Sequence, residues 1–406
     1  MALNLHRLLH GTAALIGFRG NIHLSDEDEV VLREARDAVR QELKAKFRAI
    51  SDAEPLAKAF IVEGSLRYRF GDAELRGLRL TPKFRSQGSY VYGTLNDPVP
   101  DHVPPQQVDL DDGVFVPTSF VNQERPVIAA KAYFEAVEGA LEGLCTRRGW
   151  RLCKEKSSCV RIYVGEKIHI DLPLYAIPDG DFAQVEMMAK ASGARTDAMD
   201  SAVLLESEYQ AVPDDHIMLA EREGTWRKSD PRALERWFVA AVKRHSEALR
   251  NVCRYLKAWR DNQWKEPKDG IPSITLMAIA VEVFDGAASL PPPSREDRAL
   301  HMVAAAMPEA LGRMIENPVV DGERLDGEWT QAKRSDFIAR ARTLAACLDG
   351  AMGGSSPDAA IVRMQDCLGE RIPTQPSLVQ PDEEANLLAS PRLYVAAPAV
   401  GRSVSG

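Results

Sequence analysis

The sequence contains no run of about 18 uncharged apolar residues, which is the length that a helix needs to cross a bilayer. Its first residues lack the apolar core and the cleavage site of a secretory signal peptide. Cysteines are few, six in 406 residues with no CxxC pair, which excludes a disulfide scaffold and argues against a structural zinc site. These absences predict a cytosolic protein without membrane contact.

Positive charge is also scarce. The chain has 51 Lys and Arg against 59 Asp and Glu, a net charge of −8 and a pI of about 5.6, and its basic residues are scattered among acids. Proteins that bind long nucleic acids usually present a basic stripe. If this protein handles nucleotides, small ones are therefore favoured over polymers.

The length of the chain suits two domains or two tightly packed lobes. In the first half, a helix beginning at Ser25 carries an apolar stripe as far as Ile50, at spacings of three and four residues. Strands are predicted at Phe84–Gln87 and Val108–Val116, followed by a hairpin from Val160 to Leu174 that turns at Gly165-Glu166. This half predicts an α+β lobe.

The second half is predicted to be helical. One continuous pattern covers Pro231 to Trp259, and Ser273 is expected to cap the next helix. Beyond Pro373 the composition turns to Pro, Ala, Ser and Gly, which is typical of a mobile tail. The expected domains are a catalytic lobe at 1–215, a helical lobe at 216–375 and a flexible tail at 376–406.

Acidic residues on the predicted strands carry the first chemical signal. Because strand side chains alternate, Asp109 and Asp111 point to one face and Asp112 to the other. Two adjacent carboxylates repel each other unless a positive group lies between them. A divalent ion that prefers oxygen ligands, Mg²⁺ or Mn²⁺, meets this requirement.

A third carboxylate lies on the predicted hairpin. Asp171 follows an alternating run whose isoleucines face a core, so Asp171 faces away from that core. On a strand beside the first, it completes a bay able to hold two ions, which can activate a 3′-hydroxyl and stabilise a pyrophosphate leaving group. His169 shares this face, where an outer-shell or solvated role is expected rather than a metal ligand.

Gly88-Ser89 supplies a phosphate-binding element, since glycine permits close backbone approach and a hydroxyl can bind phosphate oxygens. The order along the chain is a strand, Gly-Ser, a short helix, a DxD strand and a lone Asp on a later strand. This order is typical of polymerase-β-type nucleotidyltransferases.

Two motifs, FRSQGSYVYGTL from Phe84 and VDLDDG from Val108, resemble the cGAS/DncV-like nucleotidyltransferases. Further similarities are HID from His169, SDP from Ser229, KAWRD from Lys257, SITLM from Ser273 and the terminal VSG. The resemblance is strongest between about residues 80 and 280. It implies a polymerase-β-like lobe plus a helical lobe, with the active site in the cleft between them.

The resemblance also implies roles for individual residues. Asp109, Asp111 and Asp171 correspond to catalytic metal ligands for two Mg²⁺ or Mn²⁺ ions. Contacts to nucleotide are implied for Gln87, Gly88, Ser89, Tyr92, Arg161, Ser229, Asp230, Lys257 and Ser273. Within this set, Gly88 and Ser89 hold the donor triphosphate, and Lys257 and Ser273 reach its phosphates from the helical lobe.

Some of these residues have structural alternatives. Tyr92 can stack on a base or pack in the core, and Ser229-Asp230-Pro231 is also an ordinary helix start. For Arg161 the hairpin leading to Asp171 is one residue shorter than the family's pattern.

The implied activity is synthesis of a cyclic dinucleotide, cyclic GMP–AMP from ATP and GTP, in bacterial anti-phage signalling. The implied partners are a downstream effector protein that responds to the nucleotide and a ubiquitin-transfer-like protein acting on Gly406. Direct activation by DNA is not expected, because the chain has no cluster of Cys and His residues that could form a zinc module and no excess of basic over acidic residues. Two rival functions remain open: a nucleotidyltransferase that makes linear products or modifies an RNA or small-molecule acceptor, and an inactive nucleotide-binding scaffold.

Overall fold

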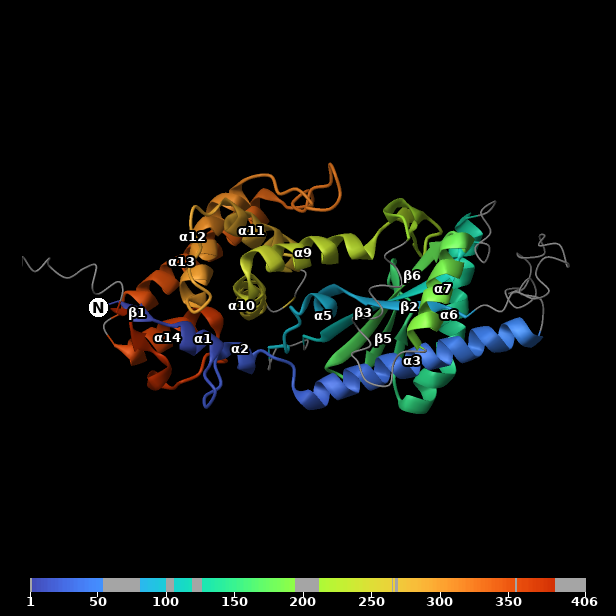
Figure 1. The fold of residues 1–406 in the computed structure, drawn as a ribbon, viewed down its shortest axis with the longest axis horizontal. Coiled ribbons are helices and arrows are strands. Elements are labelled where there is room, and N and C mark those ends of the chain that lie inside the picture. The colour runs from blue at the N-terminus through green and yellow to red at the C-terminus, as the bar shows by residue number, and fades with distance from the viewer. Residues whose placement is uncertain are drawn as a thin grey trace, which may run out of the picture.

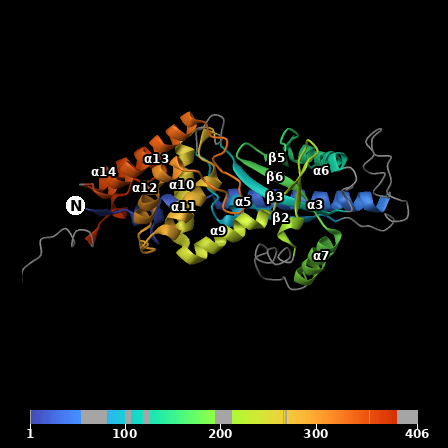
Figure 2. The same cartoon turned by 90° about the horizontal axis from the view of Figure 1, so that it is seen from above.

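The computed structural model of the chain describes residues 2–53, 81–99, 106–118, 126–193, 212–264, 266, 269–354 and 356–383. It has an elongated shape with a mixed-sheet lobe at one end and a helical lobe at the other (Figure 1). The view from above shows the same division, with α9 running from one lobe towards the other (Figure 2).

The first lobe is built on one mixed sheet with the strand order β2-β3-β6-β5-β4, to which β7 and β8 are added beside β6. The strands β3 and β6 are parallel neighbours, whereas the other pairs are antiparallel. The strands are Lys83–Gln87 (β2), Val108–Pro117 (β3), Arg151–Cys153 (β4), Cys159–Val164 (β5), Ile168–Ile177 (β6), Met218–Ala220 (β7) and Trp226–Lys228 (β8).

Two long helices cover one face of this sheet, α3 (Asp26–Ala53) and α6 (Pro126–Arg148). Ser25 begins α3 as predicted, because its hydroxyl accepts a hydrogen bond from the Asp28 amide at 3.1 Å. The apolar stripe from Leu32 to Phe47 is buried against Leu110, Ile170 and their neighbours. The core under α3 and α6 therefore fixes which face of β3 and β6 is left for polar side chains.

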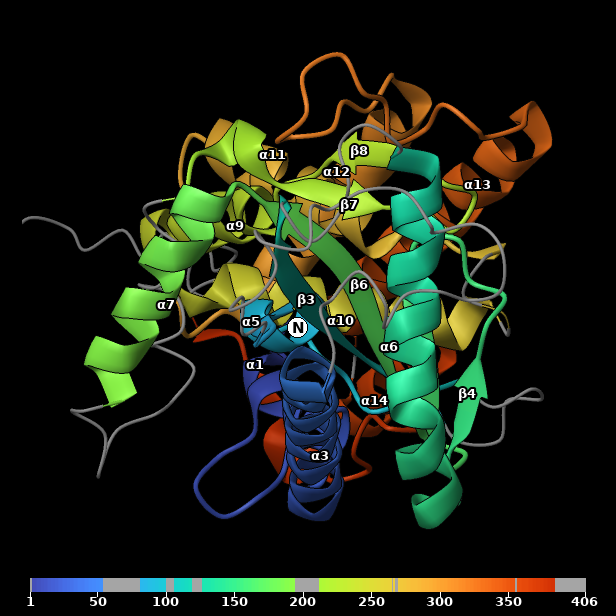
Figure 3. The same ribbon diagram turned by 90° about the vertical axis from the view of Figure 1, so that its right-hand side faces the viewer.

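A smaller core lies on the opposite face, where α7 (Asp179–Gly193) packs against Phe115 and Tyr175. Figure 3 shows α6 and α7 on opposite sides of the strands. Phe115 and Tyr175 stack with ring centroids 4.7 Å apart. This cluster covers the far ends of β3 and β6 and leaves their beginnings, where the aspartates lie, uncovered by α7.

The helical lobe has one large core. Its helices are α9 (Pro231–His245), α10 (Glu247–Gln263), α11 (Ser273–Gly286), α12 (Glu296–Gly312), α13 (Gln331–Met352) and α14 (Pro357–Leu368). The prediction of one helix from Pro231 to Trp259 is wrong, because the helix is interrupted at Ser246, which has a φ of +71°. The Ser246 hydroxyl caps α10 by accepting from the Ala248 amide at 3.4 Å.

Both ends of the described chain pack on this helical lobe, which corrects the expected domain boundaries. The first residues form β1 (Leu3–Asn4), α1 (His6–His10) and α2 (Phe18–Asn21), whose apolar side chains lie in the helical core. After a short 3₁₀ turn at Pro376–Leu378, β9 (Gln380–Pro381) pairs antiparallel with β1. Residues 2–22 thus belong with the helical lobe, and residues 376–383 are part of the fold rather than of a flexible tail.

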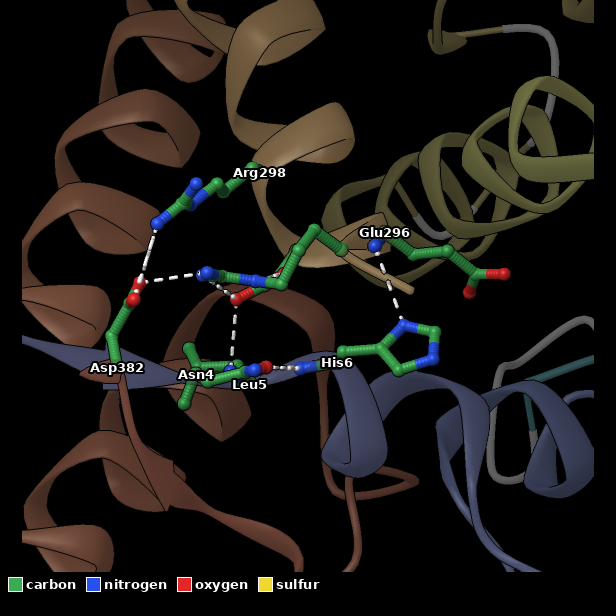
Figure 4. Close-up of polar contacts among 8 residues, drawn as sticks. Asn4, Leu5, His6, Glu296, Arg298 and Asp382 are labelled. Atoms are coloured by element: carbon green, nitrogen blue, oxygen red, sulfur yellow. Dashed lines mark hydrogen bonds and ion pairs between the residues drawn. The ribbon is translucent and has the colours of Figure 1, made fainter. Parts of the chain in front are cut away.

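Ion pairs and hydrogen bonds fasten the two ends of the described chain to the start of α12 (Figure 4). Asp382 is 5% exposed and accepts hydrogen bonds from Arg295 at 2.8 Å and from Arg298 at 2.9 Å. The Leu5 amide donates to Asp297 at 2.9 Å, and Arg295 also binds Asp297. Gly406 lies outside the described residues.

None of the helices in the described parts combines the length and the apolar composition needed to cross a bilayer. The six cysteines are free thiols.

Candidate active site

The register of β3 and β6 brings the three predicted aspartates to one face of the sheet. Asp111 lies opposite Asp171, and Asp109 lies opposite His169. Residues paired across neighbouring strands share a face, as do residues two apart along one strand. All four side chains therefore project from the face opposite α3 and α6, as the alternation in the sequence predicts.

Asp109 lies against His169. The His169 Nε2 and Asp109 Oδ1 atoms are 3.0 Å apart. Burial alone would raise the pKa of Asp109, but the His169 contact and the charges of Arg161 and Lys257 outweigh it, so the pKa is lowered. His169 is only 6% exposed, so of the two roles expected from the sequence, outer-shell or solvated, the solvated one is wrong.

Asp111 lies in the opposite electrostatic situation. Burial and the negative charges of Asp109 and Asp171 raise the pKa of Asp111 well above its ordinary value, with only Arg161 opposing them among the main causes. Gly88 is packed directly on this carboxylate: a Cβ added to Gly88 would lie 2.3 Å from Asp111 Oδ2, and the φ of Gly88 is +71°. The glycine is therefore needed here both for its backbone conformation and for space.

Asp171 is held by Arg161 of the neighbouring strand β5. The Arg161 Nε and Nη2 atoms donate to the two carboxylate oxygens of Asp171, each at 2.6 Å. This two-point pairing is the strongest geometry that an arginine and a carboxylate can form. It gives Arg161, which the resemblance assigns to nucleotide, a direct contact with the acid bay instead.

The next carboxylate along β3, Asp112, points to the other face, as the sequence predicts. It is fully buried and binds Arg40 of α3, whose Nε donates to Asp112 Oδ2 at 2.7 Å. The Ser86 hydroxyl also donates to it at 3.0 Å. Asp112 thus anchors α3 to the sheet and takes no part in the acid bay.

The Gln-Gly-Ser segment begins α5 (Gly88–Tyr92) at the edge of the bay. Gln87 lies opposite Asp111 in the β2–β3 register, and its side-chain amide donates to the Tyr175 hydroxyl at 3.2 Å. The Ser89 carbonyl accepts from the Thr94 amide at 3.0 Å and so closes the turn after α5. The predicted phosphate-binding segment and the aspartates are therefore brought together.

Lys257 reaches the turn after α5 from α10. It is 7% exposed, and its Nζ donates to the Thr94 carbonyl at 2.7 Å. Burial lowers the pKa of Lys257 to about 8, with the neighbouring Arg260 as the next cause. Ser273 is the first residue of α11 rather than its cap, which is Pro272, and its hydroxyl accepts from Arg260 Nη1 at 2.7 Å.

The residues with structural alternatives are engaged by protein groups. Tyr92 is 7% exposed and packs in the helical core, with its ring centroid 6.2 Å from that of Phe238. Asp230 caps α9 by accepting from the Arg232 amide at 2.9 Å, and both of its oxygens also bind arginine side chains. Ser229 donates its amide to the Ile217 carbonyl at 3.1 Å.

The sequence reasoning missed two features of the site. One is Gln107, which lies beside His169 with its Oε1 3.2 Å from His169 Nδ1. Its position two residues before Asp109 places it on the same face, and this was the available signal. The other is a buried ion pair between lobes, in which Arg85 donates to Glu235 of α9 at 2.6 Å.

The acid bay fits a divalent cation. Asp109, His169 and Asp171 each offer one ligand atom, and these atoms lie within 4.8 Å of one another. Asp109 Oδ1 and His169 Nε2 are buried 3.0 Å apart, and neither has a further hydrogen-bond partner in the parts of the chain that are described. Together with the like charges around Asp111, these groups form a site whose chemistry suits a bound positive ion.

Two family models match the chain. Residues 82–175 match the nucleotidyltransferase domain of the DncV-like cyclic GMP-AMP synthases, and residues 246–381 match the C-terminal domain of the cyclic GMP-AMP synthases. The first match contains the acid bay and the Gln-Gly-Ser segment, and the second contains Lys257, Ser273 and β9. The fold and the site thus define a polymerase-β-like nucleotidyltransferase.

Several relatives match most of the chain. A cyclic GMP-AMP synthase of Escherichia coli (strain TW11681) is 29% identical over 422 residues, covering 93% of each chain. The cyclic GMP-AMP synthase of Vibrio cholerae is 32% identical over 314 residues, covering 74% of this chain and 70% of its own. The chain belongs to the family of DncV-like nucleotidyltransferases.

Solved structures agree with the fold. A variant of the Vibrio cholerae dinucleotide cyclase DncV in complex with ATP, GTP and 5MTHFGLU2 has a TM-score of 0.76 at 27% identity, covering 93% of this chain and 99% of that one. DncV in complex with the linear intermediate pppA(3′,5′)pG has a TM-score of 0.74 at 27% identity, covering 93% and 98%.

Proposed function

We propose that this chain converts ATP and GTP into cyclic GMP–AMP and releases pyrophosphate at each of two steps. The observation that carries the proposal is the convergence of Asp109, Asp111 and Asp171 on one face of two adjacent parallel strands. The family membership supports it, since the named relatives are cyclic GMP-AMP synthases. The linear intermediate bound to DncV supports the order of a linear product first and ring closure second.

The three aspartates are proposed to hold Mg²⁺ or Mn²⁺, two ions in all. When bound, such ions lower the pKa of an attacking 3′-hydroxyl and stabilise the charge that develops on pyrophosphate. In the protein itself, Arg161 neutralises Asp171, whereas no ion pair joins Asp111 to any described residue. Asp111 therefore contributes the carboxylate whose charge is least compensated by the protein, and it depends most on added positive charge.

The donor triphosphate is proposed to lie on Gly88 and Ser89, beside the aspartates. Gly88 has no side chain to separate the backbone from Asp111, so phosphate oxygens can approach the amides closely. Lys257 already lies at the turn after α5, where its ammonium group can exchange the Thr94 carbonyl for a phosphate oxygen. Ser273 and Gln87 are proposed to contact nucleotide from the two sides of this segment.

Base recognition is proposed for Tyr92, Ser229 and Asp230, with Arg161 as a further contact. The side chains of Arg161 and Asp230 bind protein partners in the structure, so a base contact from either requires an exchange of partners. For Asp230 the exchange competes with both Arg232 and Arg236.

The proposal is tested by incubating purified protein with all four nucleoside triphosphates and Mg²⁺, omitting each triphosphate in turn, and identifying products by mass. Cyclic GMP–AMP should require ATP and GTP only. Asp109→Ala and Asp111→Ala should abolish it without loss of folding, whereas Asp37→Ala, on the exposed surface of α3, should not change it. Retained synthesis in either active-site variant would refute the assignment.

The rival functions give different results in the same assay. A linear product loses its terminal phosphates to a phosphatase, but a cyclic product resists because it has none. Consumption of one triphosphate only in the presence of an added RNA or small molecule would indicate a different acceptor. An inactive scaffold would release no pyrophosphate with any divalent ion.

In the cell, the protein is proposed to act in the cytosol in bacterial anti-phage signalling, with a separate effector that responds to its product. Gly406 is proposed as the residue joined to targets by a ubiquitin-transfer-like partner. Deletion of Gly406 should then prevent conjugation in cells while leaving synthesis by the purified protein unchanged. Loss of synthesis on this deletion would contradict a separate role for the terminal residue.

A further inference from the structure

His169 is a buried histidine whose outer nitrogen faces the acid bay. It lies on β6 opposite Asp109, it is 6% exposed, and its ring centroid is 5.9 Å from that of Tyr163 on β5. The two ring nitrogens of His169 face different partners. Its Nε2 atom is directed at Asp109, whereas its Nδ1 atom is directed at Gln107.

A chain of hydrogen bonds sets which nitrogen carries the proton. The Gln107 side-chain nitrogen donates to the Glu166 carbonyl at 2.8 Å, and a backbone carbonyl can only accept. The Gln107 oxygen must therefore face His169 Nδ1, which lies 3.2 Å away. Since that oxygen also only accepts, Nδ1 carries the hydrogen, and a neutral ring presents the lone pair of Nε2 to the bay.

The bay leaves this lone pair without a protein donor. His169 Nε2 and Asp109 Oδ1 approach to 3.0 Å, and neither atom has a further hydrogen-bond partner within the described ranges. With an oxygen of Asp171 they form a set of three donor atoms within 4.8 Å of one another. An imidazole whose far nitrogen donates to a fixed oxygen is the arrangement found in histidine metal ligands.

We infer that His169 is a nitrogen ligand of the cation held by Asp109 and Asp171, and that it biases this position towards Mn²⁺ over Mg²⁺. Mg²⁺ selects oxygen ligands and keeps several waters, whereas first-row transition ions bind imidazole more readily. The inference rests on the proposed function, because it concerns the cation of the same bay. It assigns to Gln107 the role of a positioning residue that acts through His169.

Pulsed electron paramagnetic resonance of Mn²⁺ bound to the full-length protein tests the inference directly. In a nitrogen-free buffer without nucleotide, the electron spin echo should show ¹⁴N coupling from the imidazole. His169→Gln should lose this coupling, raise the Kd for Mn²⁺ at least 10-fold and change the Kd for Mg²⁺ less than 3-fold. His301→Gln, on α12 in the other lobe, is the matched control and should resemble the unmodified protein in each measurement.

A second variant separates the ligand from its support and guards against misfolding of the first. Gln107→Met removes the acceptor for Nδ1 but keeps the imidazole, so it should weaken Mn²⁺ binding about 10-fold while the ¹⁴N coupling persists. Absence of ¹⁴N coupling in the unmodified protein would overturn the inference. So would its persistence in a folded His169→Gln variant.

The proposed function and the assignment of His169 as a ligand can be refuted independently of each other. If ¹⁴N coupling is present but no cyclic product forms with either ion, the proposed function is wrong and the ligand assignment stands. If cyclic product forms without ¹⁴N coupling, the proposed function stands and His169 is not a ligand.

Discussion

Replacing Gly88 with alanine tests whether the acid bay depends on the close packing of backbone against Asp111. Gly88 has a φ of +71°, and a Cβ at this position would lie 2.3 Å from Asp111 Oδ2. Gly149 has a similar φ of +67°, but a Cβ added there meets nothing within 4 Å. The two alanine variants therefore share the backbone strain and differ in the collision.

The magnitude of the effect follows from these distances. A left-handed conformation costs a non-glycine residue about 1–2 kcal/mol, and both variants should lose about this much stability. Ordinary contact begins at 3.4 Å, so in Gly88→Ala the carboxylate of Asp111 or the backbone of α5 must retreat by about 1 Å. A displacement of this size at a reacting group costs about 100-fold in rate.

The assay is pyrophosphate release with saturating ATP, GTP and Mg²⁺, combined with urea unfolding of each variant. Gly88→Ala should lower kcat about 100-fold, and Gly149→Ala should leave it within 2-fold of the unmodified protein. The free energies of unfolding of the two variants should be similar. Equal kcat values for both variants would show that the Gly88–Asp111 contact does not position the carboxylate, and the reasoning would be refuted.

Three further substitutions test other parts of the structure. Arg40→Met leaves the fully buried Asp112 without its charge partner, and should lower the free energy of unfolding by about 3–5 kcal/mol in urea titrations. Burial lowers the pKa of Lys257 from 10.5 to about 8. Between about pH 8 and 10.5 the unfolded chain therefore binds more protons than the folded protein, and the free energy of unfolding should rise with pH by up to about 1.4 kcal/mol per pH unit. Lys257→Met should lack that rise in urea titrations from pH 8 to 10, and an unchanged slope would contradict the lowered pKa. Asp382→Ala removes a buried partner of Arg295 and should destabilise the helical lobe by about 2 kcal/mol, with faster amide exchange in β1; protection equal to that of the unmodified protein would argue against the anchor.

Much of the acid bay could be predicted from the sequence because it depends on a period of two. The alternation of side chains along β3 was sufficient to place Asp109 and Asp111 on one face. Periodicity could not show that β6 is the parallel neighbour of β3, because strand order depends on long-range pairing. That step came from the family resemblance, on which the placement of Asp171 therefore depended.

The break between α9 and α10 was missed although local signals were present. The apolar pattern continues across Ser246, and no glycine or proline interrupts it. Yet Lys243, Arg244 and His245 end one helix, and Ser246 with Glu247 begins another, which is the charge order that two helix dipoles favour. The positive φ of Ser246 is uncommon for a residue with a side chain, so the periodic pattern was the stronger and misleading signal.

The packing of the chain ends could not be predicted from local sequence. The strands β1 and β9 are two residues each, too short for any periodic signal. They exist because Leu3 and Pro381 pair across almost the whole chain, next to the Asp382 anchor. The composition of the segment after residue 376 suggested mobility. The buried ion pairs of Asp382 with Arg295 and Arg298 nevertheless hold residues 376–383 on the helical lobe.

Asp111 and Asp112 show how one strand separates a structural charge from the charge that is proposed to bind the cation. They are neighbours in sequence, but strand alternation sends them to opposite faces. Asp112 is fully buried and paired with Arg40, so its charge is already compensated and serves to hold α3. Asp111 has no ion pair with any described residue, and its pKa is raised by burial and by two nearby carboxylates. An added cation therefore relieves the unfavourable charge of Asp111 more than that of Asp112, which Arg40 already compensates.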